Sequence, residues 1–115
     1  MLQTPWLKTY ETLGVVVNPP ADLTLADYME THVQERPGAL ALHYFSRSWT
    51  YAQVNAEANK IANALEAIGI GAGDVVGLHM PNIPQYYIAL MAISKLGAIG
   101  SVSYTHLTLP TILLV

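Results

Sequence analysis

Residues 75–94 form an uncharged, mostly apolar stretch that is long enough to cross a lipid bilayer as one helix. Pro81 and Pro84 interrupt this stretch near its middle. Proline lacks an amide proton and clashes with the preceding helical turn, so the stretch is not one continuous helix. We therefore interpret it as two shorter elements of a water-soluble protein, a strand over 75–80 and a helix over 84–96.

The elements around this stretch follow the alternation that is typical of α/β proteins. A helix is predicted over 51–68, before the strand at 75–80, and a further strand over 98–103 follows the helix at 84–96. This order implies parallel strands joined by right-handed crossovers. We expect an α/β fold with a partly parallel sheet and crossover helices, in which strands 75–80 and 98–103 are neighbours.

The helix predictions rest on apolar periodicity and capping residues. Apolar side chains recur at helical spacing over 24–36 and 51–68, which predicts one buried face on each helix. Thr24 is an expected N-cap, and Thr50 opens a capping box. Helix 84–96 is apolar on nearly every face, so we expect it to be buried or covered by the remainder of a longer protein.

The N-terminal part of the chain gives weaker signals. Residues 1–23 contain Asn18-Pro19-Pro20 and are predicted to be an extended lead-in without the apolar core of a signal peptide. Residues 39–45 form a short apolar run suited to a strand, and Trp49 begins a second short strand after a Ser-Arg-Ser turn. This pattern predicts a β-hairpin.

Composition excludes several classes of function. Charged residues make up 11% of the chain and apolar residues 52%, which is typical of a folded domain. The net charge is -3 and no basic stripe is present, so we expect no nucleic-acid partner. The absence of cysteine excludes disulfides, thiolate metal sites and cysteine nucleophiles, and it favours a reducing compartment such as the cytoplasm.

Few residues carry a pattern that indicates chemistry. Residues 69–73, Gly-Ile-Gly-Ala-Gly, are similar to a phosphate-binding loop, but they follow a helix and open a strand, the reverse of a dinucleotide loop. We interpret them as a turn that includes Asp74. His79 lies near the C-terminal end of a predicted strand, where sites of α/β proteins gather. The four histidines lack metal-motif spacing: His32, His43, His79 and His106.

Aromatic residues offer one further possibility. Four of them could stack on a ligand, although core or docking roles are more common for such residues: Trp6, Trp49, Tyr86 and Tyr87. The residues by themselves therefore indicate part of an α/β protein without an assembled active site.

Three segments, in order and at specific spacings, carry a family resemblance. They are Ser48-Trp49-Thr50-Tyr51 with the helix at 55–65, the turn into a strand at 69–76, and Met80-Pro81-Asn82 with Ala89-Leu90 and Lys95-Leu96-Gly97-Ala98. Over residues 24–100 they resemble the N-terminal region of adenylate-forming enzymes, the superfamily of acyl-CoA synthetases, adenylation domains and luciferases. The expected fold is an incomplete N-terminal subdomain of such an enzyme.

Two details resemble one branch of this superfamily. Pro81-Asn82 is similar to acyl-CoA synthetases, and Pro5-Trp6-Leu7 with Tyr10 is similar to the lead-in of long-chain fatty acid–CoA ligases. The resemblance implies a parent enzyme that uses ATP, Mg²⁺ and CoA to activate a fatty acid or another carboxylate. Fixed donors and the metal would stabilise charge on the transferring phosphoryl group. We expect a cytoplasmic enzyme, peripheral to the membrane and without a transmembrane segment.

The family's catalytic motifs have no counterpart in this sequence. Its phosphate loop, adenine-pocket motif, ribose-binding Asp and C-terminal Lys all lie downstream. We therefore assign no catalytic, cofactor-binding or metal residue, and we expect this chain to be inactive by itself. Two alternatives stay open: part of another adenylate-forming ligase, such as a peptide-synthetase adenylation domain, or a complete small α/β binding or interaction module.

The C-terminal residues depart from the family pattern. Residues 102–111 match the translation of a common transposase-based sequencing adapter, and the reading frame fits at Ser101 and Ile112. We expect residues 24–100 to be the partial synthetase domain and residues 101–115 to be a non-native tail that makes few specific contacts.

Overall fold

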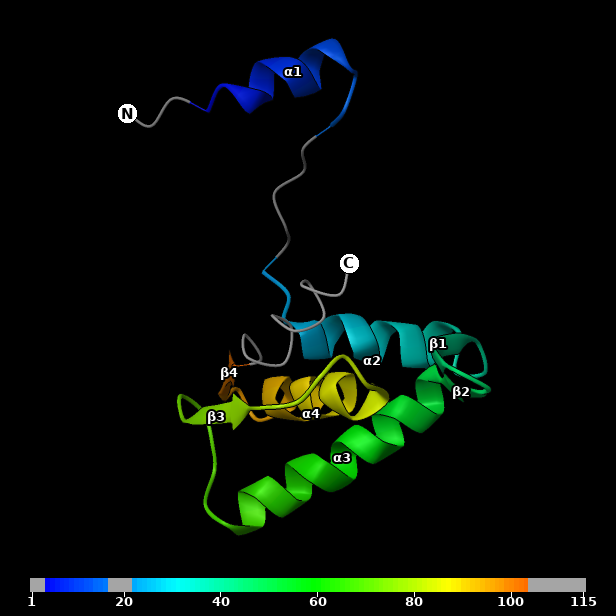
Figure 1. Ribbon diagram of the computed structural model, residues 1–115, viewed down its shortest axis with the longest axis vertical. Coiled ribbons are helices and arrows are strands. Elements are labelled where there is room, and N and C mark those ends of the chain that lie inside the picture. Colours follow the sequence, from blue (N-terminus) through cyan, green and yellow to red (C-terminus); the bar gives the residue numbers. More distant parts are fainter. Residues whose placement is uncertain (1–3, 17–21, 104–115) are drawn as a thin grey trace, which may run out of the picture.

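The computed structural model describes residues 4–16 and 22–103. Helices α2, α3 and α4 lie together with two small sheets, while α1 lies apart from them (Figure 1). The elements in chain order are α1 (Trp6–Thr12), α2 (Leu25–Glu35), β1 (Leu40–Tyr44), β2 (Arg47–Thr50), α3 (Tyr51–Ala67), β3 (Val75–Leu78), α4 (Pro84–Lys95) and β4 (Ile99–Val102). Most of the expected tail, residues 104–115 with His106, lies outside the described residues.

Helix α1 corrects the prediction of an extended lead-in over residues 1–23. Pro5 takes the N-cap position with φ −61°, and Gly14 follows the helix with φ +67°, a conformation that favours glycine. No residue of α1 is buried, and no other described helix or strand packs against it. Local preferences therefore define this helix, and seven residues are too few to show an apolar periodicity in the sequence.

The second sheet confirms the predicted neighbours. Strands β3 and β4 pair in parallel, with Val75 opposite Ile99 and Leu78 opposite Val102, and α4 joins them. Both strands are shorter than predicted, because β3 ends before His79 and β4 begins at Ile99. The α/β alternation in the sequence therefore corresponds to one β–α–β unit.

The first sheet is the predicted hairpin. Strands β1 and β2 are antiparallel, with Leu42 opposite Trp49 and Tyr44 opposite Arg47. Phe45 lies in the turn with φ +52°, an uncommon conformation for a residue with a side chain. The hairpin leads directly into α3, whose N-cap is Thr50.

The core lies between α3 and α4. Its buried residues are Val54, Ala58, Ala62, Ile88 and Ala92. Three of these five are alanines, so the two helices come close together, and α2 packs against both of them. None of the described helices has the length and hydropathy needed to span a bilayer.

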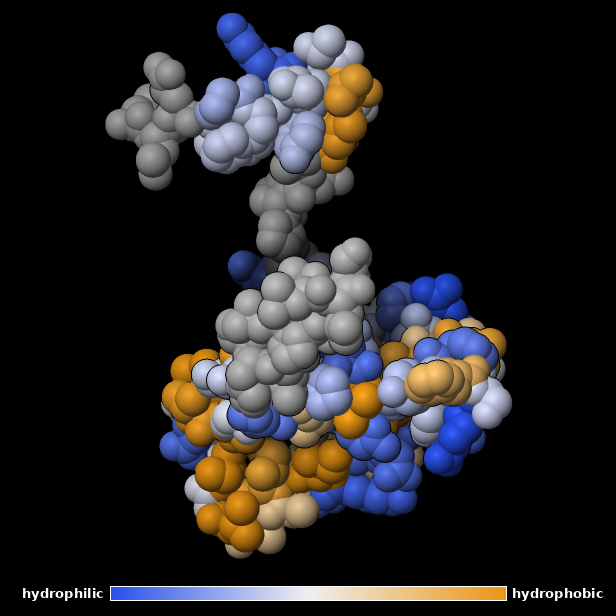
Figure 2. Space-filling model, viewed as in Figure 1, coloured by the Kyte–Doolittle hydropathy of each residue, from blue (hydrophilic) through white to orange (hydrophobic). Residues whose placement is uncertain are grey.

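Helix α4 is largely buried within this chain, because α2, α3 and both strands of the β3–β4 sheet pack against it. Further cover by the remainder of a longer protein stays a prediction. The most exposed large apolar side chain of α4 is Tyr87, at 42%. Figure 2 instead shows apolar surface near β3 and the C-terminal end of α3, where Ile68 is 75% and Val75 63% exposed.

Candidate functional site

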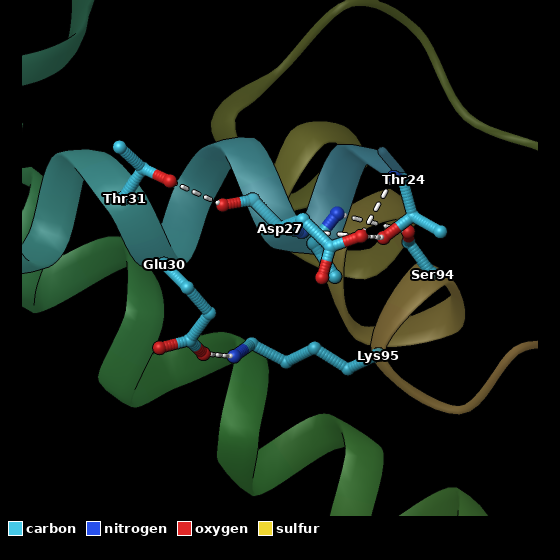
Figure 3. A network of polar contacts seen from close by, with 7 residues as sticks. Thr24, Asp27, Glu30, Thr31, Ser94 and Lys95 are labelled. Atoms are coloured by element: carbon cyan, nitrogen blue, oxygen red, sulfur yellow. Dashed lines mark hydrogen bonds and ion pairs between the residues drawn. The ribbon is translucent and has the colours of Figure 1, made fainter. Parts of the chain in front are cut away.

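A network of polar contacts joins α2 to the C-terminal end of α4 (Figure 3). The amide of Ala26 donates a hydrogen bond to Ser94 Oγ over 3.1 Å. Lys95 Nζ donates to Glu30 Oε1, and the Lys95 side chain is only 13% exposed. These contacts span 68 and 65 positions in the sequence and hold two helices in register.

The same network includes the N-cap of α2. Asp27 Oδ2 accepts hydrogen bonds from both the amide and the hydroxyl of Thr24, each over 2.7 Å. The Thr24 hydroxyl in turn accepts from the Asp27 amide over 3.2 Å, which completes a capping box. The Thr24 amide, followed by its hydroxyl, lowers the pKa of Asp27 below its ordinary value. The printed contacts of this network cap α2 and join it to α4, which is a structural role.

The glycine-rich turn does not fit a nucleotide phosphate. The Gly71 amide donates to Asp74 Oδ2 over 2.8 Å, and the Gly73 amide donates to the carbonyl of Gly97 over 3.0 Å. A phosphate cradle needs free amides at the start of a helix, whereas these amides are used internally and open strand β3. The predicted turn is confirmed, with Asp74 as its cap, and no step of ATP chemistry is assigned to it.

The histidines of the described residues lie in different places. His79 is exposed just after β3, and His32 lies on α2 against the ring of Tyr51 at 5.1 Å. His43 Nδ1 is 2.8 Å from Ser48 Oγ across the hairpin. Within residues 4–16 and 22–103, no three His, Asp or Glu side chains lie close enough together to hold a metal ion.

The four aromatic residues do not form one stacking platform. Tyr86 and Tyr87 meet edge to face at 5.2 Å on α4. Trp49 lies under the guanidinium of Arg47, with Cζ 5.2 Å from the ring centroid. Trp6 is on α1, away from the other three.

One hollow combines charge, aromatic surface and space. It has a volume of about 430 Å³ and lies between the hairpin, α3 and the start of α4. Its lining residues are Arg47, Trp49, Gln53, Ala56, Glu57, Ile61, Gln85 and Ile88. Arg47 and Trp49 are two positions apart on β2, so the sequence pattern places both side chains on one face of the strand.

Comparison with known proteins supplies the family. Residues 29–114 match the family described as AMP-binding enzyme. An acetyl-coenzyme A synthetase from Sodalis glossinidius is 36% identical over 85 residues, which cover 69% of this chain and 13% of that protein. The family match runs across residues 102–111, so the predicted boundary of a non-native tail stays a prediction.

Solved structures of related proteins are similar to this chain in both fold and sequence. The anthranilate CoA ligase AuaEII, in complex with anthranoyl-AMP, has a TM-score of 0.70 and 32% identity, covering 82% of this chain and 18% of that one. The N-terminal domain of FACL13 from Mycobacterium tuberculosis, with bound inhibitor, has a TM-score of 0.68 and 33% identity, covering 77% and 23%. This chain spans less than a quarter of each of these relatives. With its β–α–β unit and a family match over most of its length, the chain belongs to the AMP-binding enzyme family.

Proposed function

We propose that this chain is the N-terminal portion of an ATP-dependent acyl-CoA synthetase. The observation that carries the proposal is the family match over residues 29–114, together with relatives that are named as a CoA synthetase and a CoA ligase. Within such an enzyme, the described residues form a scaffold. Their polar groups cap helices and join α2 to α4, and the glycine turn uses its amides internally.

The proposed reaction has two steps. A carboxylate oxygen attacks the α-phosphorus of ATP, which forms the acyl adenylate and releases pyrophosphate. The thiol of CoA then attacks the acyl carbon, which forms the thioester and releases AMP. Mg²⁺ would offset the negative charge on the phosphates in the first step, and the groups that hold ATP and Mg²⁺ would come from residues outside this chain.

We further propose that the substrate is a fatty acid and that the enzyme works in the cytoplasm, peripheral to the membrane. The support is Pro81-Asn82, the lead-in Pro5-Trp6-Leu7, and the lack of cysteine. Named relatives act on different carboxylates, since one is an acetyl-CoA synthetase and another an anthranilate CoA ligase. The identity of the acyl substrate therefore needs a test separate from that of the reaction type.

The test uses the complete protein encoded at this locus, with the genomic sequence read through codon 100 and beyond. ATP–pyrophosphate exchange is measured with acetate, hexadecanoate, anthranilate and a set of amino acids, followed by CoA-dependent release of AMP. Exchange and thioester formation that are strongest with hexadecanoate would support the full proposal, and strongest activity with acetate would remove the fatty-acid part. The 115-residue chain serves as a matched blank, because we expect it to catalyse no exchange.

The same assay separates the alternatives. Exchange with an amino acid, without formation of a free CoA thioester, would indicate a peptide-synthetase adenylation domain. A stop codon directly after the family segment, with no exchange for any acid, would indicate a small binding module and would refute the proposal.

A further inference from the structure

The hollow between the hairpin, α3 and α4 is lined by charged, amide and apolar side chains. Arg47 extends from β2 over the ring of Trp49, and Ile61 and Ile88 supply apolar surface from the two helices. Gln53 and Gln85 add amide groups to the lining of the hollow. A volume of about 430 Å³ is within the range of small-molecule sites, which are mostly apolar with a few placed polar groups.

The guanidinium of Arg47 is free to bind an anion. The ion pairs within the described residues are Lys60 with Glu57 and Lys95 with Glu30, so no described carboxylate neutralises Arg47. The guanidinium carbon of Arg47 lies 5.2 Å from the centre of the Trp49 ring, so the ring holds the guanidinium beside the hollow, and its N–H groups can donate to a ligand. The ring of Trp49 thus holds the planar guanidinium of Arg47 beside the hollow, and no described carboxylate forms an ion pair with it.

The rest of the hollow decides which anion fits. Glu57 is the lining carboxylate, and it is paired with Lys60 Nζ at 2.8 Å, so it repels an anion only weakly. The Gln53 side-chain oxygen already accepts from the Thr50 amide over 2.9 Å, which leaves the Gln53 amide nitrogen as a donor toward a ligand. Arg47 and Gln53 thus supply hydrogen-bond donors among the lining residues, and Trp49, Ile61 and Ile88 supply apolar surface.

We propose that this hollow is a binding site for an organic carboxylate with a short hydrocarbon body. The carboxylate would accept two parallel hydrogen bonds from Arg47, and the hydrocarbon would lie against Trp49, Ile61 and Ile88. An inorganic anion would leave the apolar side chains of the hollow exposed to water. An ammonium ligand would be repelled by the positive charge of Arg47. The site is formed by this chain alone, so the proposal does not depend on the adenylation activity.

The test measures binding of hexanoate to the 115-residue chain by isothermal titration calorimetry, without ATP. Trp49 fluorescence in a Trp6→Phe background is the second readout. Hexanol, hexylamine and inorganic phosphate serve as neutral, cationic and inorganic comparators. Arg47→Ala tests the guanidinium, and Arg36→Ala is its matched control, because Arg36 also lies over an aromatic ring, that of Tyr51 at 5.6 Å, but does not line the hollow.

We expect hexanoate to saturate one site and to quench or shift Trp49 emission. Arg47→Ala should weaken its binding about tenfold or more, as expected for a hydrogen-bonded charge pair, whereas Arg36→Ala should change it by less than about twofold. Hexanol or hexylamine binding as tightly as hexanoate would overturn the carboxylate site, and so would equally tight phosphate. Equal losses in Arg36→Ala and Arg47→Ala, or no saturable binding, would also overturn it.

Discussion

Replacing Ile93 by alanine tests whether the β–α–β unit is packed as the structure shows. The Ile93 side chain is 2% exposed and belongs to the core on the sheet side of α4. A Cβ built on Gly100 in β4 would lie 3.9 Å from Ile93 Cγ2, so this side chain fills the space between helix and strand. The substitution therefore opens a cavity at the contact that closes the crossover.

The expected loss in the free energy of unfolding follows from the number of carbon atoms that Ile93→Ala removes. Isoleucine has three more side-chain carbons than alanine, and about 0.8 kcal/mol per buried carbon gives roughly 2.4 kcal/mol for lost transfer free energy. The cavity adds to this, so we expect a loss of about 3 kcal/mol in the free energy of unfolding, inside the usual range of roughly 2–5 kcal/mol. With a urea m-value of about 1–3 kcal/mol/M, the unfolding midpoint should fall by roughly 1–3 M.

The assay is urea unfolding of the 115-residue chain, followed by circular dichroism at the helical signal. Ile68→Ala is the matched control, because Ile68 is exposed at the C-cap of α3 and should change stability by less than about 0.5 kcal/mol. Equal effects of the two substitutions, or a loss below about 1 kcal/mol for Ile93→Ala at unchanged m-value, would refute the packing of α4 on the sheet.

Three further changes address the caps and the turns. Thr50→Ala should lower the free energy of unfolding by about 1 kcal/mol through loss of the α3 N-cap, and Thr50→Ser, which keeps the hydroxyl, should restore most of it in the same urea assay. Because the pKa of Asp27 is lowered in the folded chain, its stabilising effect is present above the ordinary value of 3.8 and is lost as pH falls through the lowered pKa. The difference in stability between the wild type and Asp27→Asn, measured by urea unfolding from pH 7 to pH 2, should therefore shrink at the acid end; a constant difference would contradict the capping assignment. Gly97→Ala should cost about 1–2 kcal/mol, because Gly97 has φ +67°, whereas Gly71→Ala, at ordinary φ and with no atom within 4 Å of the added Cβ, should change thermal stability little.

Elements with strong local sequence patterns could be predicted before the structure was known. Two threonine caps and apolar periodicity located α2 and α3, and the Pro81–Pro84 interruption separated β3 from α4. The turn at residues 69–73 was also decided locally, because glycines between a helix and a strand cannot place their amides at the start of a helix. The family followed from the order and spacing of three such segments.

The sequence was a poor guide where a signal was short or ambiguous. Helix α1 has seven residues and no buried side chain, so it left no periodicity to detect. The even apolarity of α4 fitted either a central helix or one covered by other parts of a longer protein. Only the tertiary structure shows that α2 and α3 pack against α4, because the same side chains are apolar in both cases.

Contacts between distant residues could be identified only in the folded chain. The hydrogen bond between the Ala26 amide and Ser94 and the ion pair between Glu30 and Lys95 join residues more than 60 positions apart, and no local pattern marks such pairs. The same is true of the hollow, where Arg47 and Trp49 from a hairpin face Ile88 from α4. Periodicity records which face of an element is buried, but the partner of that face depends on how the chain closes its loops, and only the packed structure fixes that choice.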